Sequence, residues 1–357
     1  MLLLDPSLLQ LQVAVRAPGI IDPWPAEPRN GSRHSVGQPP ICRCTSPARP
    51  EVLNTPDQVQ QRRGCASSAP CSVHHCGVEP LGHSDQSNHR QDHPRSAGAA
   101  SGIGKSIGEY LTQKGYTVFG SSRKPENYPD SPFQLFQLDV RDETSVTQFV
   151  EKVLAAAGRI DVLINNVGVG ITGPIEEIPE SEIKGVFETN FYGPVRMIKA
   201  VLPQMRMQHS GLVINVTSIA AYMGLPYRGF YSASKSALEI TTEALRMETK
   251  QFGIEMTNIA PGDFATNIAA GRYHAPLLEN SPYKEAYGDT LDLMNSHVDT
   301  GKDPLEMAKA VHKIIETEHP KVRYKVGSFM QRLSVFLKNN LPGKRYEKML
   351  MKHYKLK

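Results

Sequence analysis

From residue 96 onward, short apolar runs alternate with longer stretches of helical periodicity, and this alternation constrains the fold more than any other feature of the chain. The apolar runs, rich in β-branched and aromatic residues, predict strands at 116–122, 133–140, 160–165, 211–218, 254–261 and 323–327. The periodic stretches predict helices at 104–115, 143–157, 180–208, 227–252 and 304–318. Strands separated by helices of this length predict an α/β fold with a doubly wound parallel sheet and helices on both faces.

Composition changes sharply near residue 95. All five cysteines and the single tryptophan lie before this point, and the same stretch contains no Lys, Phe or Tyr. A segment with so few large apolar residues buries too little surface to offset the entropy of ordering. We therefore expect a disordered segment over 1–95, a folded domain over 96–330 and a basic helical tail over 331–357.

Charge and cysteine spacing exclude several classes of function. The net charge of +4 is small for 357 residues, so nucleic acid is not an expected partner. No apolar run reaches the roughly 18 residues that a transmembrane helix needs. Cys71, His74, His75 and Cys76 do not have the spacing of a standard zinc site, so we expect no metal. We expect a cytoplasmic protein.

Two motifs follow predicted strands at the edge where α/β sheets bind ligands. Gly98, Gly102 and Gly104 form a glycine-rich turn before a helix, which lets backbone amides approach a pyrophosphate. The pattern is weak when taken alone. Asn165 and Asn166 end the strand at 160–165, where asparagine equally often only satisfies the backbone of a turn.

The strongest constellation is Ser218, Tyr231 and Lys235. Tyr231 and Lys235 are four residues apart in a predicted helix and therefore share one face. Ser218 ends a strand thirteen residues before the tyrosine, where a loop can bring the two hydroxyls together. A nearby ammonium favours the ionised form of a phenol, which suits it to acid/base catalysis. The alternative is an ordinary Tyr/Lys pair on a helix surface.

"GAASGIG", "NNVG", "YSASK" and "PGDFAT", in this order and spacing, resemble the short-chain dehydrogenase/reductase family over residues 97 to about 330. The chain is generally similar to the branch of this family that includes hydroxysteroid and retinol dehydrogenases. The resemblance implies that Tyr231 is the catalytic acid/base, that Lys235 assists it and holds the nicotinamide ribose, and that Ser218 binds the substrate oxygen. It also implies that Asn190 anchors a water that relays protons toward the lysine.

The resemblance further implies a nicotinamide cofactor. The residues assigned to it, besides Lys235, are Gly98, Ser101, Gly102, Ile103, Gly104, Ser122, Arg123, Asp139, Val140, Asn166, Gly168, Pro261, Gly262 and Thr266. After the strand at 116–122 there is no acidic residue before Glu126, whereas Ser122 and Arg123 suit a 2′-phosphate. We therefore expect NADP(H) rather than NAD(H). For Asp139 the alternative is a helix cap or turn residue.

Substrate and partners are less closely defined. Residues 267–297 mix Leu, Met, Tyr and Ala, with Tyr273, His274 and Tyr287 as candidate polar contacts. They indicate a hydrophobic secondary alcohol or ketone of steroid, retinoid or lipid type. The resemblance implies a homodimer or homotetramer built through the helices at 180–208 and 227–252. The basic tail, with apolar residues at helical spacing, either packs on its own domain or makes a weak contact with an anionic membrane.

One element of the family fold has no counterpart in the expected place. The glycine turn should follow a buried central strand, but residues 88–95 read "NHRQDHPR" and are polar. The strands at 116–122 and 160–165 would then lose their hydrogen-bond partners. We infer a shifted reading frame or misplaced gene start before residue 96. The alternative to an active enzyme is a catalytically impaired member of the family that acts at most as a binding or regulatory protein.

Overall fold

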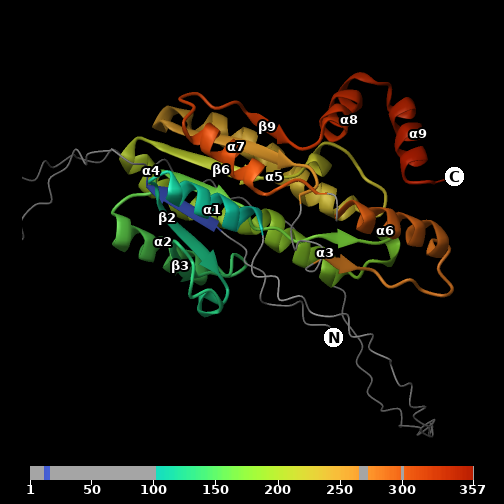
Figure 1. The fold of residues 1–357 in the computed structure, drawn as a ribbon, viewed down its shortest axis with the longest axis horizontal. Helices are drawn as coiled ribbons and strands as arrows, with labels where there is room; N and C mark the ends of the chain where they lie inside the picture. Colours follow the sequence, from blue (N-terminus) through green and yellow to red (C-terminus); the bar gives the residue numbers. More distant parts are fainter. Residues whose placement is uncertain (1–11, 17–101, 265–271, 299–300, 357) are drawn as a thin grey trace, which may run out of the picture. The chain divides into compact units, whose positions relative to one another are not determined.

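The computed structural model describes residues 12–16, 102–264, 272–298 and 301–356, which all belong to one compact unit (Figure 1). Its centre is a seven-stranded sheet in which six strands are parallel to one another and β1 alone is antiparallel to them. The strands, in their order across the sheet, are β3 (Gln134–Gln137), β2 (Thr117–Ser122), β1 (Gln12–Arg16), β4 (Val162–Asn165), β6 (Gly211–Val216), β7 (Ile254–Pro261) and β9 (Arg323–Val326). The expected α/β fold with a doubly wound sheet is confirmed.

The central position of the sheet is occupied by β1, a segment far from the glycine turn in sequence. β1 is antiparallel to both neighbours, with Val15 opposite Val118 of β2 and Val162 of β4. β1 therefore gives β2 and β4 a hydrogen-bond partner on this side, whereas the absence of the family's own first strand stays a prediction. Free N–H and C=O groups of two parallel strands can be satisfied by an extended segment of either direction, and "QVAVR" supplies one.

The direction of β1 distinguishes it from a strand that leads into the glycine turn. Its first residue, Gln12, is opposite Asn165 at the carboxyl end of β4, and Arg16 is opposite Thr117 at the start of β2. The end of β1 nearest the carboxyl edge is thus its beginning. The polar run at 88–95 lies outside the described residues, so the absence of a strand there stays a prediction. The disorder of 1–95, apart from β1, and the boundary near 95 also stay predictions.

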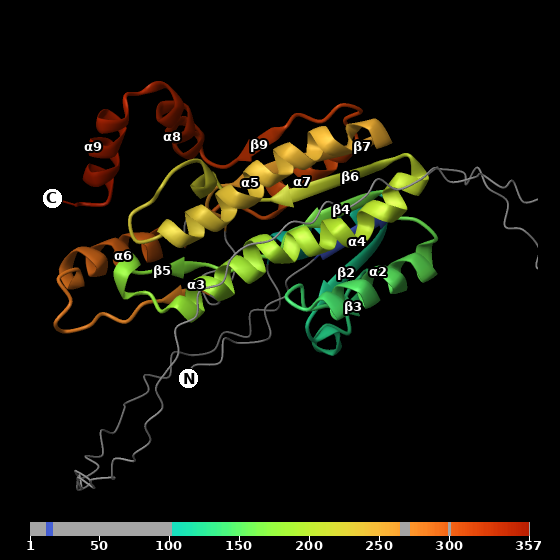
Figure 2. The same ribbon diagram turned by 180° about the vertical axis from the view of Figure 1, so that it is seen from behind.

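Helices cover both faces of the sheet, and each face has its own apolar core. On one face, α1 (Ile103–Gln113) and α7 (Leu305–Ile315) pack side by side, as Figure 1 shows. On the other face lie α2 (Glu143–Ala157), α4 (Gly193–Gln208) and α5 (Gly229–Thr249), visible in Figure 2. Burial on both faces explains why the strands between them are continuous apolar runs.

The boundaries of α2 follow directly from its sequence. The side chain of Asp142 accepts hydrogen bonds from the backbone of Thr144 and Ser145, which satisfies N–H groups that have no partner within the helix. At the other end Gly158 adopts φ 74°, a left-handed conformation that glycine takes without strain. The helix expected at 143–157 is confirmed at both ends.

The stretch 180–208 is helical but not one helix. It divides into α3 (Glu180–Phe187), a π-helical turn η3 (Glu188–Tyr192) and α4. Pro194 lies in the first turn of α4 and has no N–H to donate to the preceding turn, which favours an irregularity there.

Several elements were not expected from the sequence. They are a small parallel sheet of β5 (Ile171–Thr172) with β8 (Tyr273–His274), and the helix α6 (Lys284–Val298). The C-terminal region forms two helices, α8 (Phe329–Asn340) and α9 (Gly343–His353), whose Val335 and Tyr346 are buried against the domain. In the part of the chain that the structure describes, no helix is both long and apolar enough to span a membrane.

Candidate functional site

The elements that carry the predicted catalytic side chains meet at the carboxyl edge of the sheet. Ser218 follows β6 and precedes the 3₁₀ turn η4 (Ile219–Tyr222), against which α5 packs. Tyr231 and Lys235 lie on successive turns of one face of α5. All three are buried, with exposed fractions of 9% for Ser218, 8% for Tyr231 and 3% for Lys235.

Lys235 is fixed at the end of β6. Its Nζ donates a hydrogen bond to the carbonyl oxygen of Val216 over 3.0 Å. Burial lowers the pKa of Lys235 to about 8, because the ammonium has lost most of its water. The side chain still carries its proton at neutral pH, so a positive charge is held next to the tyrosine-bearing turn.

Gly168 and Asn190 lie against this lysine. A Cβ atom on Gly168 would lie 3.0 Å from Nζ of Lys235 and 3.5 Å from Oδ1 of Asn190. No side chain fits at this position unless the lysine moves. The turn after β4 is therefore glycine for a steric reason, and it brings the backbone beside the ammonium.

The amide of Asn190 connects that turn to α5. Its Oδ1 accepts from the backbone N–H of Val169 over 2.8 Å, and its Nδ2 donates to the carbonyl of Val169 over 2.9 Å and to Oγ of Ser234 over 3.1 Å. Ser234 in turn donates to the carbonyl of Tyr231 over 2.9 Å. Asn190 belongs to the π-helical turn η3, which places its fully buried amide between the two elements. Its role in a proton relay stays a prediction.

Ser218 and Tyr231 are carried on elements that touch. Oγ of Ser218 accepts from the backbone N–H of Ala220 over 3.1 Å and so caps η4. Ala220 belongs to the same buried cluster as Tyr231. The guanidinium carbon of Arg228 lies 5.4 Å from the centre of the Tyr231 ring, a contact not foreseen from the sequence.

The two asparagines after β4 have different surroundings. Asn165 is fully buried and donates to Oδ1 of Asn215 over 2.7 Å, and Asn215 donates to Oγ1 of Thr242 over 2.8 Å. Asn165 thus links β4 to β6 and α5. The side chain of Asn166 forms no hydrogen bond within the described ranges and is free for a ligand.

The N-terminus of α1 fits a phosphate group. Gly102 precedes Ile103, the first residue of α1, and no side chain caps this end and no acidic residue lies in the first turn. A Cβ atom on Gly102 would meet no atom of the described residues within 4 Å, which leaves room beside the backbone there. Free amides in such a place are suited to a pyrophosphate. Gly104 is buried in α1, whereas Gly98 and Ser101 lie outside the described residues.

The end of β2 fits a second phosphate. Nε of Arg123 is buried and has no hydrogen-bond partner among the described residues. A buried donor without a partner is costly, and a phosphate oxygen would satisfy it. Oγ of Ser122 accepts from the backbone N–H of Lys124 over 3.1 Å, which shapes the turn around the guanidinium. The residues present therefore suit a phosphorylated ribose.

Asp139 is not the cap of α2, since Asp142 has that place. Its carboxylate is bound by the guanidinium of Arg141 over 2.6 Å, and this hydrogen bond holds the pKa of Asp139 below its usual range. Val140, which follows, is buried against Gly193 of α4. Contacts of Asp139 and Val140 with an adenine ring stay predictions.

The segment after β7 is held by the C-terminal region. The backbone N–H of Gly262 donates to the carbonyl of Val326 over 2.8 Å, and a Cβ atom on Gly262 would collide with the amide of Gln331. Gln331 donates to Oδ2 of Asp263 over 2.6 Å. The sequence pattern did not reveal Gln331, because its partners are about 70 residues away. Thr266 lies outside the described residues.

The candidate polar contacts for a substrate are largely used within the protein. Oη of Tyr287 is buried and lies within 3.3 Å of the carbonyl oxygens of Thr172 and Ala275. Nδ1 of His274 lies 3.0 Å from Oγ1 of Thr172, and burial lowers the pKa of this histidine. These hydrogen bonds connect β5, β8 and α6, which pack together in the same apolar cluster as Tyr231.

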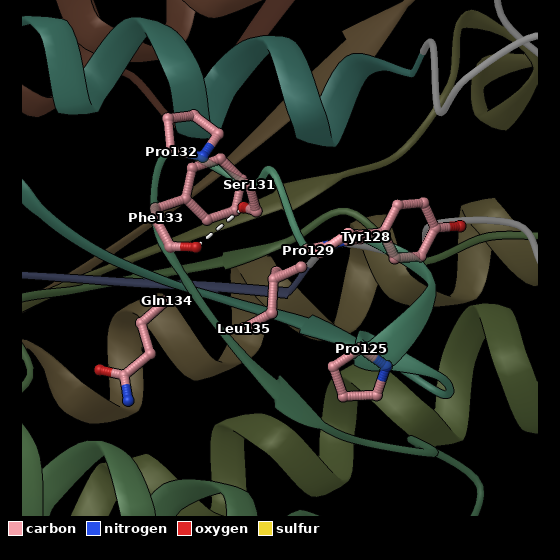
Figure 3. Close-up of a pocket in the computed structure, with 8 residues that line it drawn as sticks. All are labelled: Pro125, Tyr128, Pro129, Ser131, Pro132, Phe133, Gln134 and Leu135. Atoms are coloured by element: carbon pink, nitrogen blue, oxygen red, sulfur yellow. Dashed lines mark hydrogen bonds between the residues drawn. The ribbon is translucent and has the colours of Figure 1, made fainter.

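A surface hollow of about 440 Å³ lies elsewhere, along the connection from β2 to β3 (Figure 3). Its lining is Pro125, Tyr128, Pro129, Ser131, Pro132, Phe133, Gln134 and Leu135, and it includes no charged side chain. Oγ of Ser131 donates to the carbonyl of Phe133 over 2.8 Å, the bond drawn in the figure. With no convergent charged or catalytic group, this hollow is not the candidate site.

No group of three or more His, Cys, Asp or Glu side chains suited to a metal occurs within the described ranges. The cysteines and histidines weighed as zinc ligands, Cys71, His74, His75 and Cys76, lie outside those ranges.

Comparison with known proteins agrees with the geometry. Residues 97–276 match the model of the family described as short chain dehydrogenase. A 3-ketodihydrosphingosine reductase of Bacteroides thetaiotaomicron is 40% identical over 69% of this chain and 91% of its own length. An NADPH-dependent 3-dehydrocapnine reductase of Ornithobacterium rhinotracheale is 31% identical over 72% of this chain and 95% of its own. Among solved structures, a short-chain dehydrogenase from Streptomyces avermitilis has a TM-score of 0.61 at 34% identity, covering 72% of this chain and 95% of that one.

Proposed function

The chain belongs to the short-chain dehydrogenase family, whose oxidoreductases act on CH–OH groups, and from this membership we propose a reaction for it. The chain uses NADP(H) to interconvert a long-chain, lipid-like ketone and the corresponding secondary alcohol. The observation that carries the proposal is the buried set of Ser218, Tyr231 and Lys235 at the carboxyl edge of the sheet.

In the reducing direction, Oη of Tyr231 gives its proton to the substrate oxygen as the carbonyl becomes an alcohol. Oγ of Ser218 donates a hydrogen bond to that oxygen and stabilises its developing negative charge. The ammonium of Lys235, held by the carbonyl of Val216, stabilises the phenolate that remains. NADPH, when bound, supplies the hydride that the carbonyl carbon receives.

The cofactor would be held at both ends of the site. The amides at Gly102 and Ile103 receive the pyrophosphate, and Ser122 with Arg123 receives the 2′-phosphate. Asn166, Gly168 and Pro261 line the path between these points, at the ends of β4 and β7. The unsatisfied Nε of Arg123 supports NADP(H) over NAD(H), and the Ornithobacterium relative is NADPH-dependent by its name.

The proposed substrate class rests on the surroundings of Tyr231. Its cluster is apolar, with Ile171, Ile178, Val186 and Ala275 buried around it. Apolar surroundings of this kind are compatible with an alkyl chain next to the tyrosine. The Bacteroides and Ornithobacterium relatives are named for the reduction of 3-ketodihydrosphingosine and 3-dehydrocapnine, which favours a long-chain ketone over the steroid and retinoid alternatives.

Turnover of 3-ketodihydrosphingosine with NADPH, followed by loss of NADPH fluorescence, tests the proposal. Tyr231→Phe removes the proton donor and should lower kcat by about 10²–10⁴-fold while NADPH still binds. Turnover by the variant at the wild-type rate would overturn the assignment of Tyr231.

Titration with NADPH separates an enzyme from the impaired relative considered as the alternative. A catalytically competent chain binds NADPH at micromolar to millimolar concentration. Absence of binding at millimolar NADPH by a folded protein would reject the enzyme and favour the alternative.

We also propose a homodimer or homotetramer formed through α4 and α5. Three large apolar side chains on these helices face solvent, with exposed fractions of 71% for Met207, 62% for Ile240 and 74% for Met247. A second copy of the same surface would cover them. Ile240→Lys with Met247→Lys should shift the sedimentation coefficient to that of a monomer; an unchanged oligomer would refute this interface.

The C-terminal helices supply a surface for weak membrane contact. Phe329, Met330 and Phe336 are 69%, 68% and 59% exposed. The segment 329–356 contains one acidic residue, Glu347, against the basic residues Arg332, Lys338, Lys344, Arg345, Lys348, Lys352 and Lys355. Exposed apolar groups beside basic ones bind anionic bilayers. Co-flotation with phosphatidylserine vesicles but not with phosphatidylcholine vesicles is the expected result. The cytoplasmic location stays a prediction.

A further inference from the structure

Two arginines lie beside Tyr231 although carbonyl reduction requires neither. Arg228 immediately precedes α5, and its guanidinium carbon is 5.4 Å from the centre of the tyrosine ring. Arg272 immediately precedes β8, and its charge acts on Tyr231 as well as on Arg228. The tyrosine assigned as the proton donor therefore has two cations in its surroundings.

Arg272 is held in place by the backbone on which it packs. A Cβ atom on Gly170 would lie 2.8 Å from Cγ and 3.0 Å from Nε of Arg272, so the arginine stem lies directly on this glycine. The next residue, Tyr273, donates its N–H to the carbonyl of Gly170 over 3.0 Å. The position of the Arg272 side chain is thus defined by its packing on the small sheet of β5 and β8.

The guanidinium of Arg272 lacks a full set of partners. Its Nη1 is buried and donates no hydrogen bond to any of the described residues. Burial, and then the neighbouring charge of Arg228, lower the pKa of Arg272. Two neighbouring positive charges repel each other, and a buried N–H without an acceptor lowers the stability of the folded state. An anion bound between the two guanidinium groups would remove both costs.

Within the residues that the structure describes, the groups near these two arginines balance only part of their positive charge. Asp263 is a carboxylate whose charge acts on Arg272, but its Oδ2 accepts from Gln331 over 2.6 Å, and one negative charge does not balance two guanidinium groups. Tyr287, which also faces Arg272, has its hydroxyl among backbone carbonyls. Arg228 has the hydroxyl of Tyr354 as a hydrogen-bond partner, and a neutral phenol leaves its charge uncompensated.

We propose that Arg228 and Arg272 form a binding site for an anionic oxygen group of the substrate, a sulfonate or carboxylate, carried one or two bonds from the carbonyl that Tyr231 serves. The planar forks of two guanidinium groups match the oxygens of such a group. The inference rests on the proposed reduction of a long-chain ketone and adds a charged end to that substrate. The chain then prefers anionic ketones over neutral ones of the same length.

A matched pair of probes tests this preference. The two probes are a long-chain β-keto sulfonate and the corresponding β-keto methyl sulfone. The sulfone has a methyl group where the sulfonate has its negatively charged oxygen, so only the sulfonate is an anion. Wild-type enzyme with NADPH should have the higher kcat/KM on the sulfonate. Arg272→Gln and Arg228→Gln should each reduce the ratio of kcat/KM values, sulfonate over sulfone, by at least about tenfold, since hydrogen bonds to charged groups contribute about that factor or more.

Arg206→Gln is the matched control. The guanidinium carbon of Arg206 also lies over an aromatic ring, 5.9 Å from the centre of the Phe252 ring, but Arg206 belongs to α4 and not to the proposed site. It should leave the ratio unchanged. Arg272→Lys keeps the charge without the fork and should give an intermediate ratio. NADPH titration of every variant verifies that it is folded. An equal ratio in wild type, Arg272→Gln and Arg228→Gln would overturn the anion site while leaving the reductase intact.

A second measurement keeps the two proposals distinguishable. If neither ketone is reduced, the reductase proposal fails for this substrate class, and the site is then tested by binding alone. Hexadecyl sulfonate should bind the wild-type protein at least about tenfold more tightly than Arg272→Gln. Equal affinities would reject the anion site whatever the activity.

Discussion

Replacing Lys235 by methionine should stabilise the protein at neutral pH while abolishing its activity. The lysine is 3% exposed, and burial lowers its pKa from 10.5 to about 8. At pH 7 the ammonium is charged in both states but fully hydrated only in the unfolded one. The pKa difference therefore lowers the free energy of unfolding by about 3 kcal/mol. Loss of the hydrogen bond to Val216 offsets about 1–2 kcal/mol of the gain.

The pH dependence identifies the cause. Between about pH 8 and pH 10.5 the unfolded wild-type chain binds a proton that the folded chain has released, so wild-type stability rises relative to Lys235→Met across this window. Below pH 8 both states are protonated and the variant keeps its full advantage of about 1–2 kcal/mol.

Urea unfolding of both proteins at a series of pH values measures this difference, because other titrating groups contribute equally to both. The advantage of the variant should disappear and reverse between about pH 8 and pH 10.5, where the amine is neutral in the folded state but still protonated in the unfolded state. A variant that is less stable than wild type at pH 7 by an amount that does not change with pH would refute the reasoning. That result would mean that the interactions of Lys235 with its partners stabilise the folded protein, and that its burial does not destabilise it.

Two further predictions concern steric space and cofactor charge. Gly168→Ala should lower kcat by displacing the ammonium of Lys235, which would lie 3.0 Å from the new methyl group; Gly185→Ala, whose Cβ meets nothing within 4 Å, is the control, and equal kcat values would contradict the prediction. Arg123→Ala should raise Kd for NADPH by about tenfold or more and leave that for NADH nearly unchanged, measured by fluorescence titration. Equal losses for both cofactors would place the 2′-phosphate elsewhere.

Local patterns predicted much of what positions the site. The caps at Asp142 and Gly158 determine the ends of α2, and the apolar runs became the strands of the main sheet. The spacing of Tyr231 and Lys235 placed both on one face of α5. Each of these depends on interactions within a few residues, which a sequence displays directly.

Other features depend on contacts between distant segments. Whether 180–208 is one helix was decided by η3, where the amide of Asn190 reaches Val169 at the end of β4. The contact between Gly262 and Gln331 requires β7 and α8 to meet. Nothing in the local pattern of either segment indicates its partner.

By itself the sequence determined the α/β alternation and the motif residues Ser218, Tyr231 and Lys235, because helical and strand periodicity are properties of neighbours along the chain. Only the tertiary structure decided that β1 fills the centre of the sheet in antiparallel direction, and that Arg228 and Arg272 lie beside Tyr231. Backbone hydrogen bonds between strands can be satisfied by any extended segment, and charges brought together by folding leave no periodic signal. The places of these motif residues on the strand end and the helix were therefore predictable, whereas their charged surroundings were not.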